Sequence, residues 1–422
     1  MQCKLLKNIL KIIFNMNFLN KNFLSLILFL FINLSFADEK AKDPDTVESV
    51  LRKFKLMQNT SKQNLTQAIK SNKSNLSKPQ IESFLKLSQN SGQPINLVEH
   101  FGNNFSGLDL SGLDFSNTIL YKADFSDSNL TDCTFVNTFL EEANFNNALL
   151  NNTIFIDSDL SRSNFSNSDL SNSKLSNIYA KNAKFLSTKL LNTKIFSSNF
   201  SNSHFDNCNF NNTKIVKTKF NYTLFSNVHA LNLFWNLNFF CYSRFNNLTI
   251  ENSSLAAIDW SNSNFDKVTF ENSHIFAANF QNCIISNANF NKMTAKAANF
   301  SEANLSKIII NKSKMDYALF QDCNASEFIV RLCNLDSSNF RRAEISNSYI
   351  LSSNLKNSTL YQAIINNSAI HNSYLYKVNF SKSKLTNLTI NDSNLSKSNF
   401  RMAKAGNFTL KNNLIKDILV NE

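Results

Sequence analysis

The sequence contains very little glycine and proline, with 5 Gly and 3 Pro among 422 residues. This scarcity excludes collagen-like, proline-rich and glycine-rich linker proteins. It also leaves few of the turn residues that a multi-loop α/β enzyme needs. Tryptophan is rare as well, with 2 residues against 40 Phe, while 43% of the chain is hydrophobic. The composition therefore indicates a large apolar core with an unusually uniform side-chain content.

The N-terminus has the pattern of a secretory signal peptide. The segment 1–22 carries four lysines and no acidic residue, and the apolar run 23–32 and the small residue Ala37 follow. We therefore expect residues 1–37 to be a signal peptide cleaved after Ala37, which exports the chain to the periplasm or the exterior. Because the run is shorter than the roughly 20 residues that span a bilayer, membrane contact is expected only if the segment stays uncleaved as an inner-membrane anchor.

The charge of the mature chain is moderate. Removing residues 1–37 leaves 39 basic and 31 acidic residues, a net charge of +8. A value this small for a chain of this length is not typical of a dedicated nucleic-acid-binding protein, so specific nucleic-acid binding is not expected.

A strict period of five organises residues 104–422. From Phe105 to Val420 every fifth residue is apolar, which gives 64 positions, 24 of them Phe. The residue two positions earlier is small or apolar, with Asn103, Asn238 and Asn413 as the exceptions. Five matches neither the helical nor the strand period. Two inward residues in each pentad instead fit a chain that turns a corner with every pentad and closes a square coil in four pentads.

This pattern resembles the pentapeptide-repeat family, as in Ala123-Asp124-Phe125-Ser126-Asp127 or Ala298-Asn299-Phe300-Ser301-Glu302. The resemblance implies an all-β fold, a right-handed quadrilateral β-helix. Its 64 pentads would make 16 coils, a rod of about 77 Å at strand spacing. Family members often have Gly after the hydroxyl residue; Asn is the usual residue there in this chain, and it tolerates left-handed turns.

Residues 38–103 do not follow the period of five. Apolar residues at helical spacing occur at 47–57, at 65–69 and around Ile81, Phe84 and Leu85 behind Pro79. We expect a small helical segment that covers the N-terminal end of the rod, because a bare coil end exposes strand edges. The C-terminal residues 410–420 are expected to form a last coil or a short amphipathic cap. The resemblance implies that a C-terminal segment can mediate a homodimer.

The sequence offers no catalytic or metal site. Five cysteines occupy the small inward position, where Cys acts as a modest hydrophobe, and none lies four pentads from another. The histidines have no metal-motif spacing and no triad partners, and no glycine-rich phosphate loop occurs. We therefore expect neither an enzyme nor a cofactor.

Three sets of outward residues are candidates for binding a partner. Lysines spaced four pentads apart should stack into a ladder that suits an anionic envelope component such as lipid headgroups or lipopolysaccharide: Lys174, Lys194 and Lys214. Exposed apolar residues should form two further surfaces that suit a protein partner. The first is a stripe of Ile309, Ile329, Tyr349 and Leu351. The second is a cluster of Phe234, Phe239 and Tyr242 around Trp235. For each set the alternative is ordinary surface composition or local packing. The coil with Asn238 is expected to bulge.

Taken together, the residues predict an exported, non-enzymatic rod that serves as a binding or structural scaffold in the bacterial envelope or exterior. The resemblance implies an alternative, inhibition of DNA gyrase by imitating duplex DNA. That role needs a long acidic face, and here residues 104–170 have a net charge of −8 whereas residues 171–422 have +13. A secreted effector that binds a host protein is a further alternative.

Overall fold

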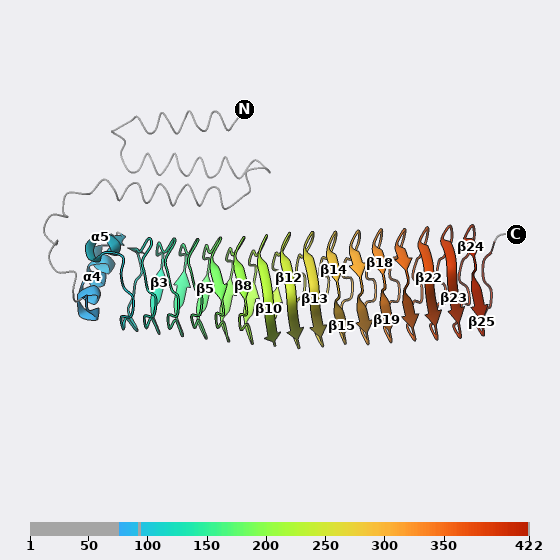
Figure 1. The fold of residues 1–422 in the computed structure, drawn as a ribbon, viewed down its shortest axis with the longest axis horizontal. Coiled ribbons are helices and arrows are strands. Elements are labelled where there is room, and N and C mark those ends of the chain that lie inside the picture. Colours follow the sequence, from blue (N-terminus) through green and yellow to red (C-terminus); the bar gives the residue numbers. More distant parts are fainter. Residues whose placement is uncertain (1–75, 92–93, 421–422) are drawn as a thin grey trace, which may run out of the picture. The chain divides into compact units, whose positions relative to one another are not determined.

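The computed structural model describes residues 76–91 and 94–420 (Figure 1). Along the chain, two short helices come first and a stack of parallel coils follows them. The predicted signal peptide and the predicted helical series at 47–57 and 65–69 lie outside the described residues. The helices are α4 (Lys78–Ser91) and α5 (Leu97–Phe101). Pro79 lies in the first turn of α4, where its missing N–H costs nothing. The Asn96 side chain caps α5 by accepting the Glu99 N–H.

The helices bury apolar side chains against the first coils. Ile81, Leu85 and Leu97 are buried in the same core as Phe105. The Lys78 ammonium donates to the Ser111 carbonyl in the first coil. The apolar series around Ile81 therefore forms the helix predicted for it, and that helix covers the N-terminal end of the core.

Each pentad forms one face of a four-sided coil. We number the faces by their central inward residues: face 1 carries Phe105, face 2 Leu110, face 3 Phe115 and face 4 Leu120, and each face recurs with every fourth pentad. The central N–H bonds to the next coil, as from Phe125 N to Asn144 O at 2.7 Å. Two residues after each central residue, the corner residue has positive φ. From Asn117 to Asp417 there are 61 such non-glycine residues, with φ between 48° and 63°, and 27 of them are Asn.

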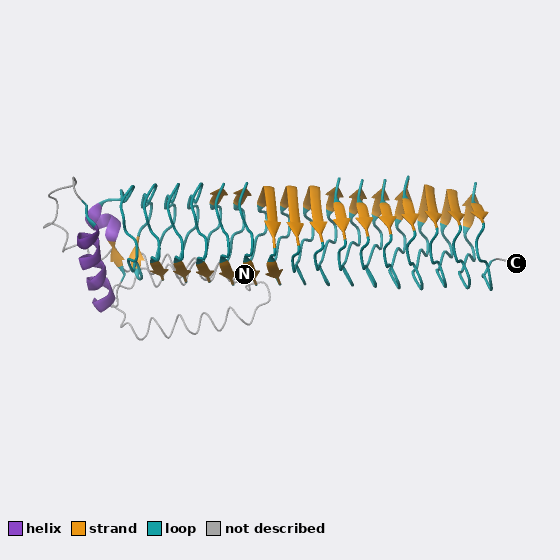
Figure 2. Cartoon of the chain, turned by 90° about the horizontal axis from the view of Figure 1, so that it is seen from below, coloured by secondary structure: helices purple, strands orange, loops and turns teal. Residues whose placement is uncertain are grey.

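The regular strands change faces along the stack (Figure 2). A first pair joins β1 (Ile95–Asn96) to β2 (Thr118–Ile119). Face 3 carries the strands of the N-terminal half: β3 (Thr134–Val136), β4 (Ile154–Ile156), β5 (Lys174–Ser176), β7 (Lys194–Phe196), β9 (Lys214–Val216) and β11 (Phe234–Asn236). Faces 1 and 2 carry the others: β6 (Lys184–Leu186), β8 (His204–Asp206), β10 (Leu224–Leu231), β12 (Arg244–Glu251), β13 (Asn264–Glu271), β14 (Ile284–Ser286), β15 (Asn289–Asn291), β16 (Asn304–Ser306), β17 (Ile309–Asn311), β18 (Asn324–Ser326), β19 (Ile329–Arg331), β20 (Glu344–Ser346), β21 (Tyr349–Leu351), β22 (Ile364–His371), β23 (Lys384–Asn391), β24 (Lys404–Gly406) and β25 (Thr409–Lys411). The strands of the stack pair in parallel with the equivalent strand of the next coil, as Phe135 does with Phe155.

Stacked phenylalanines fill the interior. Nine rings on face 1, from Phe105 to Phe265, follow one another at centroid distances of 4.6–5.4 Å. A second column on face 4 runs from Phe280 to Phe340 at 4.6–5.1 Å. Offset stacking adds roughly 0.5–1.5 kcal/mol per pair beyond area burial, so the columns favour coils that stay in register.

The coil with Asn238 does not bulge, so that expectation is wrong. β11 pairs with β9 in the regular register, with Trp235 opposite Ile215. Asn238 is fully buried; its Nδ2 donates to the Ile215 carbonyl, and its Oδ1 accepts from Thr218 N, both at 2.9 Å. The amide therefore satisfies two backbone groups of the preceding coil and keeps the register.

The C-terminal residues form a last coil rather than a helical cap. Thr409 pairs with Thr389 through β25 and β23, and Leu414 and Leu419 bridge to the preceding coil. The central residues Leu410 and Ile415 of this coil are exposed.

Candidate binding surfaces

The predicted lysine ladder lies on face 3. Lys174, Lys194 and Lys214 are register partners on β5, β7 and β9, and all three side chains are exposed. The ammonium of Lys214 lies 5.1 Å from the ring centroid of Phe234 and 5.9 Å from that of Phe196. Phe234 takes the next position of the same column. The ladder and the predicted aromatic cluster therefore meet in one continuous column.

The aromatic cluster extends round the corner between faces 3 and 4. Phe234 projects from face 3 and Phe239 from face 4, while Trp235 is buried between them. Tyr242, at the far corner of face 4, stacks on Tyr222 of the preceding coil with centroids 5.1 Å apart. Sequence reasoning missed Tyr222 and also missed Leu237, which is 47% exposed at the corner. Their signal is a bulky apolar residue at a corner position that usually holds Asn.

The apolar stripe lies on face 2. Ile309, Ile329 and Tyr349 are successive register partners on β17, β19 and β21. Leu351 is half-buried on the same strand as Tyr349. Leu332, at the corner beside this face, is 55% exposed, and its N–H donates to the Leu351 carbonyl at 3.0 Å. The structure thus assembles the predicted stripe and adds Leu332 to it.

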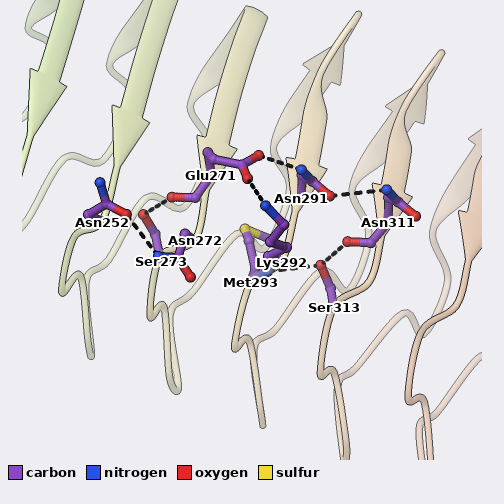
Figure 3. Close-up of polar contacts among 9 residues, drawn as sticks. All are labelled: Asn252, Glu271, Asn272, Ser273, Asn291, Lys292, Met293, Asn311 and Ser313. Carbon is purple, nitrogen blue, oxygen red and sulfur yellow. Dashed lines mark hydrogen bonds and ion pairs between the residues drawn. The ribbon is translucent and has the colours of Figure 1, made fainter.

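Polar ladders hold the coils that lead to this stripe (Figure 3). Glu271 accepts from Asn291 and pairs with Lys292 at 3.1 Å, and Asn311 Nδ2 donates to Asn291 Oδ1 at 3.1 Å. Below them, Met293 N donates to Ser313 Oγ at 3.0 Å. These outward amides bond along the stack, so the neighbouring apolar side chains project from a fixed backbone.

The acidic residues of the N-terminal coils do not gather on one face. Asp109 and Asp169 lie on face 2, Asp124 on face 1 and Asp159 on face 4, as their bridge partners show. Several of these carboxylates accept hydrogen bonds from their own turns, and the Ser111 hydroxyl and N–H lower the pKa of Asp109. The negative charge of residues 104–170 is therefore distributed around the coil.

Five of the six cysteines in the described part of the chain are buried, and Cys241 is half-buried. Burial raises the pKa of the Cys133, Cys208, Cys283 and Cys323 thiols to about 12 and that of Cys333 to about 11. Within residues 76–91 and 94–420 all cysteines are free, and no group of three His, Cys, Asp or Glu is placed to hold a metal ion. Both helices of this part of the chain are too short or too polar to cross a bilayer.

The stack consists of uninterrupted five-residue faces, four to each coil. This architecture is that of a solenoid protein. The model of the pentapeptide repeats matches the chain in eight copies, over residues 104–137, 140–177, 163–202 and 273–311. These matched residues are pentapeptide repeats, and the same period of five continues through the rest of the stack.

Solved structures similar to this chain include other proteins of five-residue repeats. QnrB1, a plasmid-mediated fluoroquinolone resistance protein, is 14% identical, with 43% of this chain and 91% of that chain covered and a TM-score of 0.31. HetL from the cyanobacterium Nostoc sp. strain PCC 7120 is 18% identical, with 59% and 94% covered and a TM-score of 0.25. A thylakoid-lumen protein of Arabidopsis thaliana is 27% identical, with 26% and 68% covered and a TM-score of 0.19. No curated protein matches the chain by sequence.

Proposed function

We propose that this chain is an exported, non-enzymatic scaffold of the bacterial envelope or exterior that binds a partner protein through its face 2 stripe. One observation carries the proposal. Ile309, Ile329 and Tyr349 are register partners on consecutive coils, whose outward positions are mostly Asn, Ser, Asp and Lys. Ile309 and Tyr349 are exposed, and Ile329 between them is half-buried. A contiguous exposed apolar surface of this kind marks a contact site.

The absence of enzymatic activity is part of the proposal. Burial raises the pKa of the Cys208 thiol to about 12, and buried apolar side chains, among them stacked phenylalanine rings, fill the interior. Because the interior is filled, a partner would contact the outward faces. Catalytic sites usually lie in concave pockets, so an outward face is better suited to recognising a partner than to catalysis.

The binding role is tested by photocrosslinking in cells. A photoreactive phenylalanine analogue at Ile329 should give a discrete crosslinked species, and the analogue at Asn289, on the same face two coils earlier, should not. A crosslink to a second copy would identify the homodimer implied by the family resemblance as the partner. Equal crosslinking from both positions, or none from either, would contradict the proposal.

Export is tested by N-terminal sequencing of the protein from separated cell fractions. A chain that begins at Asp38 in the periplasm or medium is expected. An intact N-terminus in the inner membrane would make the chain an anchored rod. A cytosolic, uncut chain would instead favour the gyrase alternative, which predicts loss of gyrase binding when Asp109, Asp124, Asp159 and Asp169 are changed to Asn. A role as a secreted effector predicts recovery of the mature chain inside a host cell.

A further inference from the structure

Over four consecutive coils faces 3 and 4 contain no acidic residue, and the first three of these coils carry lysines. There these faces are made by residues 173–182, 193–202, 213–222 and 233–242. They contain no Asp or Glu and six lysines: Lys174, Lys181, Lys194, Lys214, Lys217 and Lys219. Acidic residues return on face 4 immediately beyond, where Asp159 bridges to Tyr179 and Asp259 to Phe239. The other two faces carry acids in these coils or beside them, such as Asp206 and Glu251.

Bulky apolar side chains continue this basic surface at its C-terminal end. On face 4, Lys217 and Tyr222 occupy the two corners of one coil, and Lys219 occupies the outward position just before the central residue. Leu237, Phe239 and Tyr242 occupy the same three positions of the next coil and are 47%, 44% and 53% exposed. One coil before the lysines, these positions hold Ser197, Asn199 and Asn202. The apolar residues therefore form a local group that adjoins the lysines.

We propose that faces 3 and 4 of residues 173–242, here called the basic–aromatic surface, dock on an anionic bilayer. Leu237, Phe239 and Tyr242 enter the headgroup region, and the lysines contact the lipid phosphates. Aromatic and aliphatic side chains beside lysines are the combination that interfacial membrane-binding surfaces use. Each lysine near an anionic leaflet adds attraction, and its apolar stem can lie along the neighbouring apolar residues.

The composition and shape of the surface favour a bilayer over other partners. Lysine is depleted at protein–protein interfaces, whereas six lysines lie here. Single-stranded nucleic acid binds in a positively charged groove with stacking platforms, whereas the two faces of a square coil meet at an outward corner. That corner carries Lys217 and Leu237, so the part of the surface that projects furthest is both basic and apolar.

The inference goes beyond the proposed function, because it concerns faces 3 and 4 rather than the face 2 stripe, and its test does not depend on export. The purified full chain is sedimented with phosphatidylcholine vesicles, with and without phosphatidylglycerol, at low and high salt. The N-terminal segment is the same in every variant, so differences report on the basic–aromatic surface.

Two variants remove the two halves of the surface. Lys214→Gln with Lys219→Gln should weaken binding to the anionic vesicles by about fivefold per lysine. Leu237→Asn with Phe239→Asn should weaken it at least as much, although Asn suits both positions of the fold. Two control pairs lie on later coils around face 4: the apolar pair takes the positions of Leu237 and Phe239, and the lysine pair takes the corner positions of Lys217 and Tyr222. Tyr317→Asn with Leu319→Asn removes an exposed apolar pair beside Asp316 and Asp322, and Lys377→Gln with Lys382→Gln removes the same charge. Neither control should change binding.

The expected result is salt-sensitive binding to anionic vesicles that both test pairs reduce and both control pairs leave unchanged. No binding, equal binding to neutral vesicles, or an equal effect of the control pairs would overturn the inference. Loss with the lysine pair alone would also overturn it, because the site would then recognise soluble polyanions or a protein rather than a bilayer. If the chain is exported but does not bind vesicles, the membrane inference fails and the proposed function stands. If the chain is cytosolic but binds vesicles, the proposed export fails and the membrane inference stands.

Discussion

At the scale of single residues, the corners decide how well a side chain suits this fold. Every corner residue from Asn117 to Asp417 has left-handed backbone, which costs most L-residues about 1–2 kcal/mol and costs Asn less. The frequency of Asn at this position in the sequence predicted this conformation. The sequence also places Leu and Tyr at corners, as at Leu237 and Tyr222, and an exposed side chain there meets no steric limit beyond its own backbone.

Exchanging residues at one corner tests this cost. Leu332 and Asn372 occupy the same corner two coils apart, with φ of 53° and 52°. Leu332→Asn should raise the free energy of unfolding by about 0.5–1 kcal/mol, and Asn372→Leu should lower it by a similar amount. Urea unfolding of both variants against the parent chain measures the two changes. Shifts of the same sign in both variants would contradict the argument.

The buried thiols give a dependence on alkaline pH. In the folded chain burial raises the pKa of Cys208 to about 12, whereas an unfolded thiol titrates near 8.5. The folded state therefore retains a proton that the unfolded state releases, and stability should fall as pH rises from about 9 towards 12.

Cys208→Ser isolates this effect, because Ser occupies the same inward position elsewhere, as at Ser203, whose hydroxyl bonds to Ala180 O as Cys208 bonds to Phe185 O. Unfolding measured at pH 7 and pH 10 should differ less for the variant than for the parent chain. An unchanged difference would show that other groups cause the alkaline loss.

At the scale of a coil, one buried amide replaces a small residue without disturbing the register. The sequence identified Asn238 as an exception to the rule of small inward residues, but the predicted bulge is wrong. Sequence reasoning could not anticipate that one side chain reaches two backbone groups of the preceding coil. It placed the ladder and the stripe because both depend only on the four-pentad repeat. It missed Tyr222 and Leu237, although Tyr222 lies four pentads before the predicted Tyr242 and Leu237 one pentad before it.

Removing this amide should cost stability. Asn238→Ala leaves Thr218 N and the Ile215 carbonyl without these partners, a loss of roughly 1–3 kcal/mol. Asn238→Ser should lose less, because serines at this position accept the same backbone N–H, as Ser243 does from Thr223. Thermal unfolding of the two variants gives the comparison, and equal losses would argue against the hydrogen-bond account.

At the scale of the whole stack, stability is local, since each coil contacts only its neighbours. The two ends of the described stack differ: α4 covers the first coils, whereas the central residues of the last coil are exposed. Leu85→Asp should therefore destabilise the first coils by roughly 2–5 kcal/mol and leave the middle of the stack unchanged.

Hydrogen exchange checks this expectation. Amides of the first coils, around Phe105–Leu120, should exchange faster in Leu85→Asp, while those of β12 and β13 keep their protection. Ser83→Asp, at an exposed position of α4, serves as the control. Uniform loss of protection along the chain would show that the stack unfolds as a single unit.

One coil takes four pentads, and all four faces are built alike. The number of pentads between two residues therefore fixes the angle between them about the axis of the stack. Inserting four pentads between the lysine ladder and the face 2 stripe would move them apart by one coil and leave both orientations unchanged. Inserting a single pentad would preserve the core pattern but rotate everything downstream by a quarter turn, which carries Ile309, Ile329 and Tyr349 onto face 3. The angle between the two surfaces is thus counted in pentads, and gain or loss of single repeats could reorient them without redesigning either one.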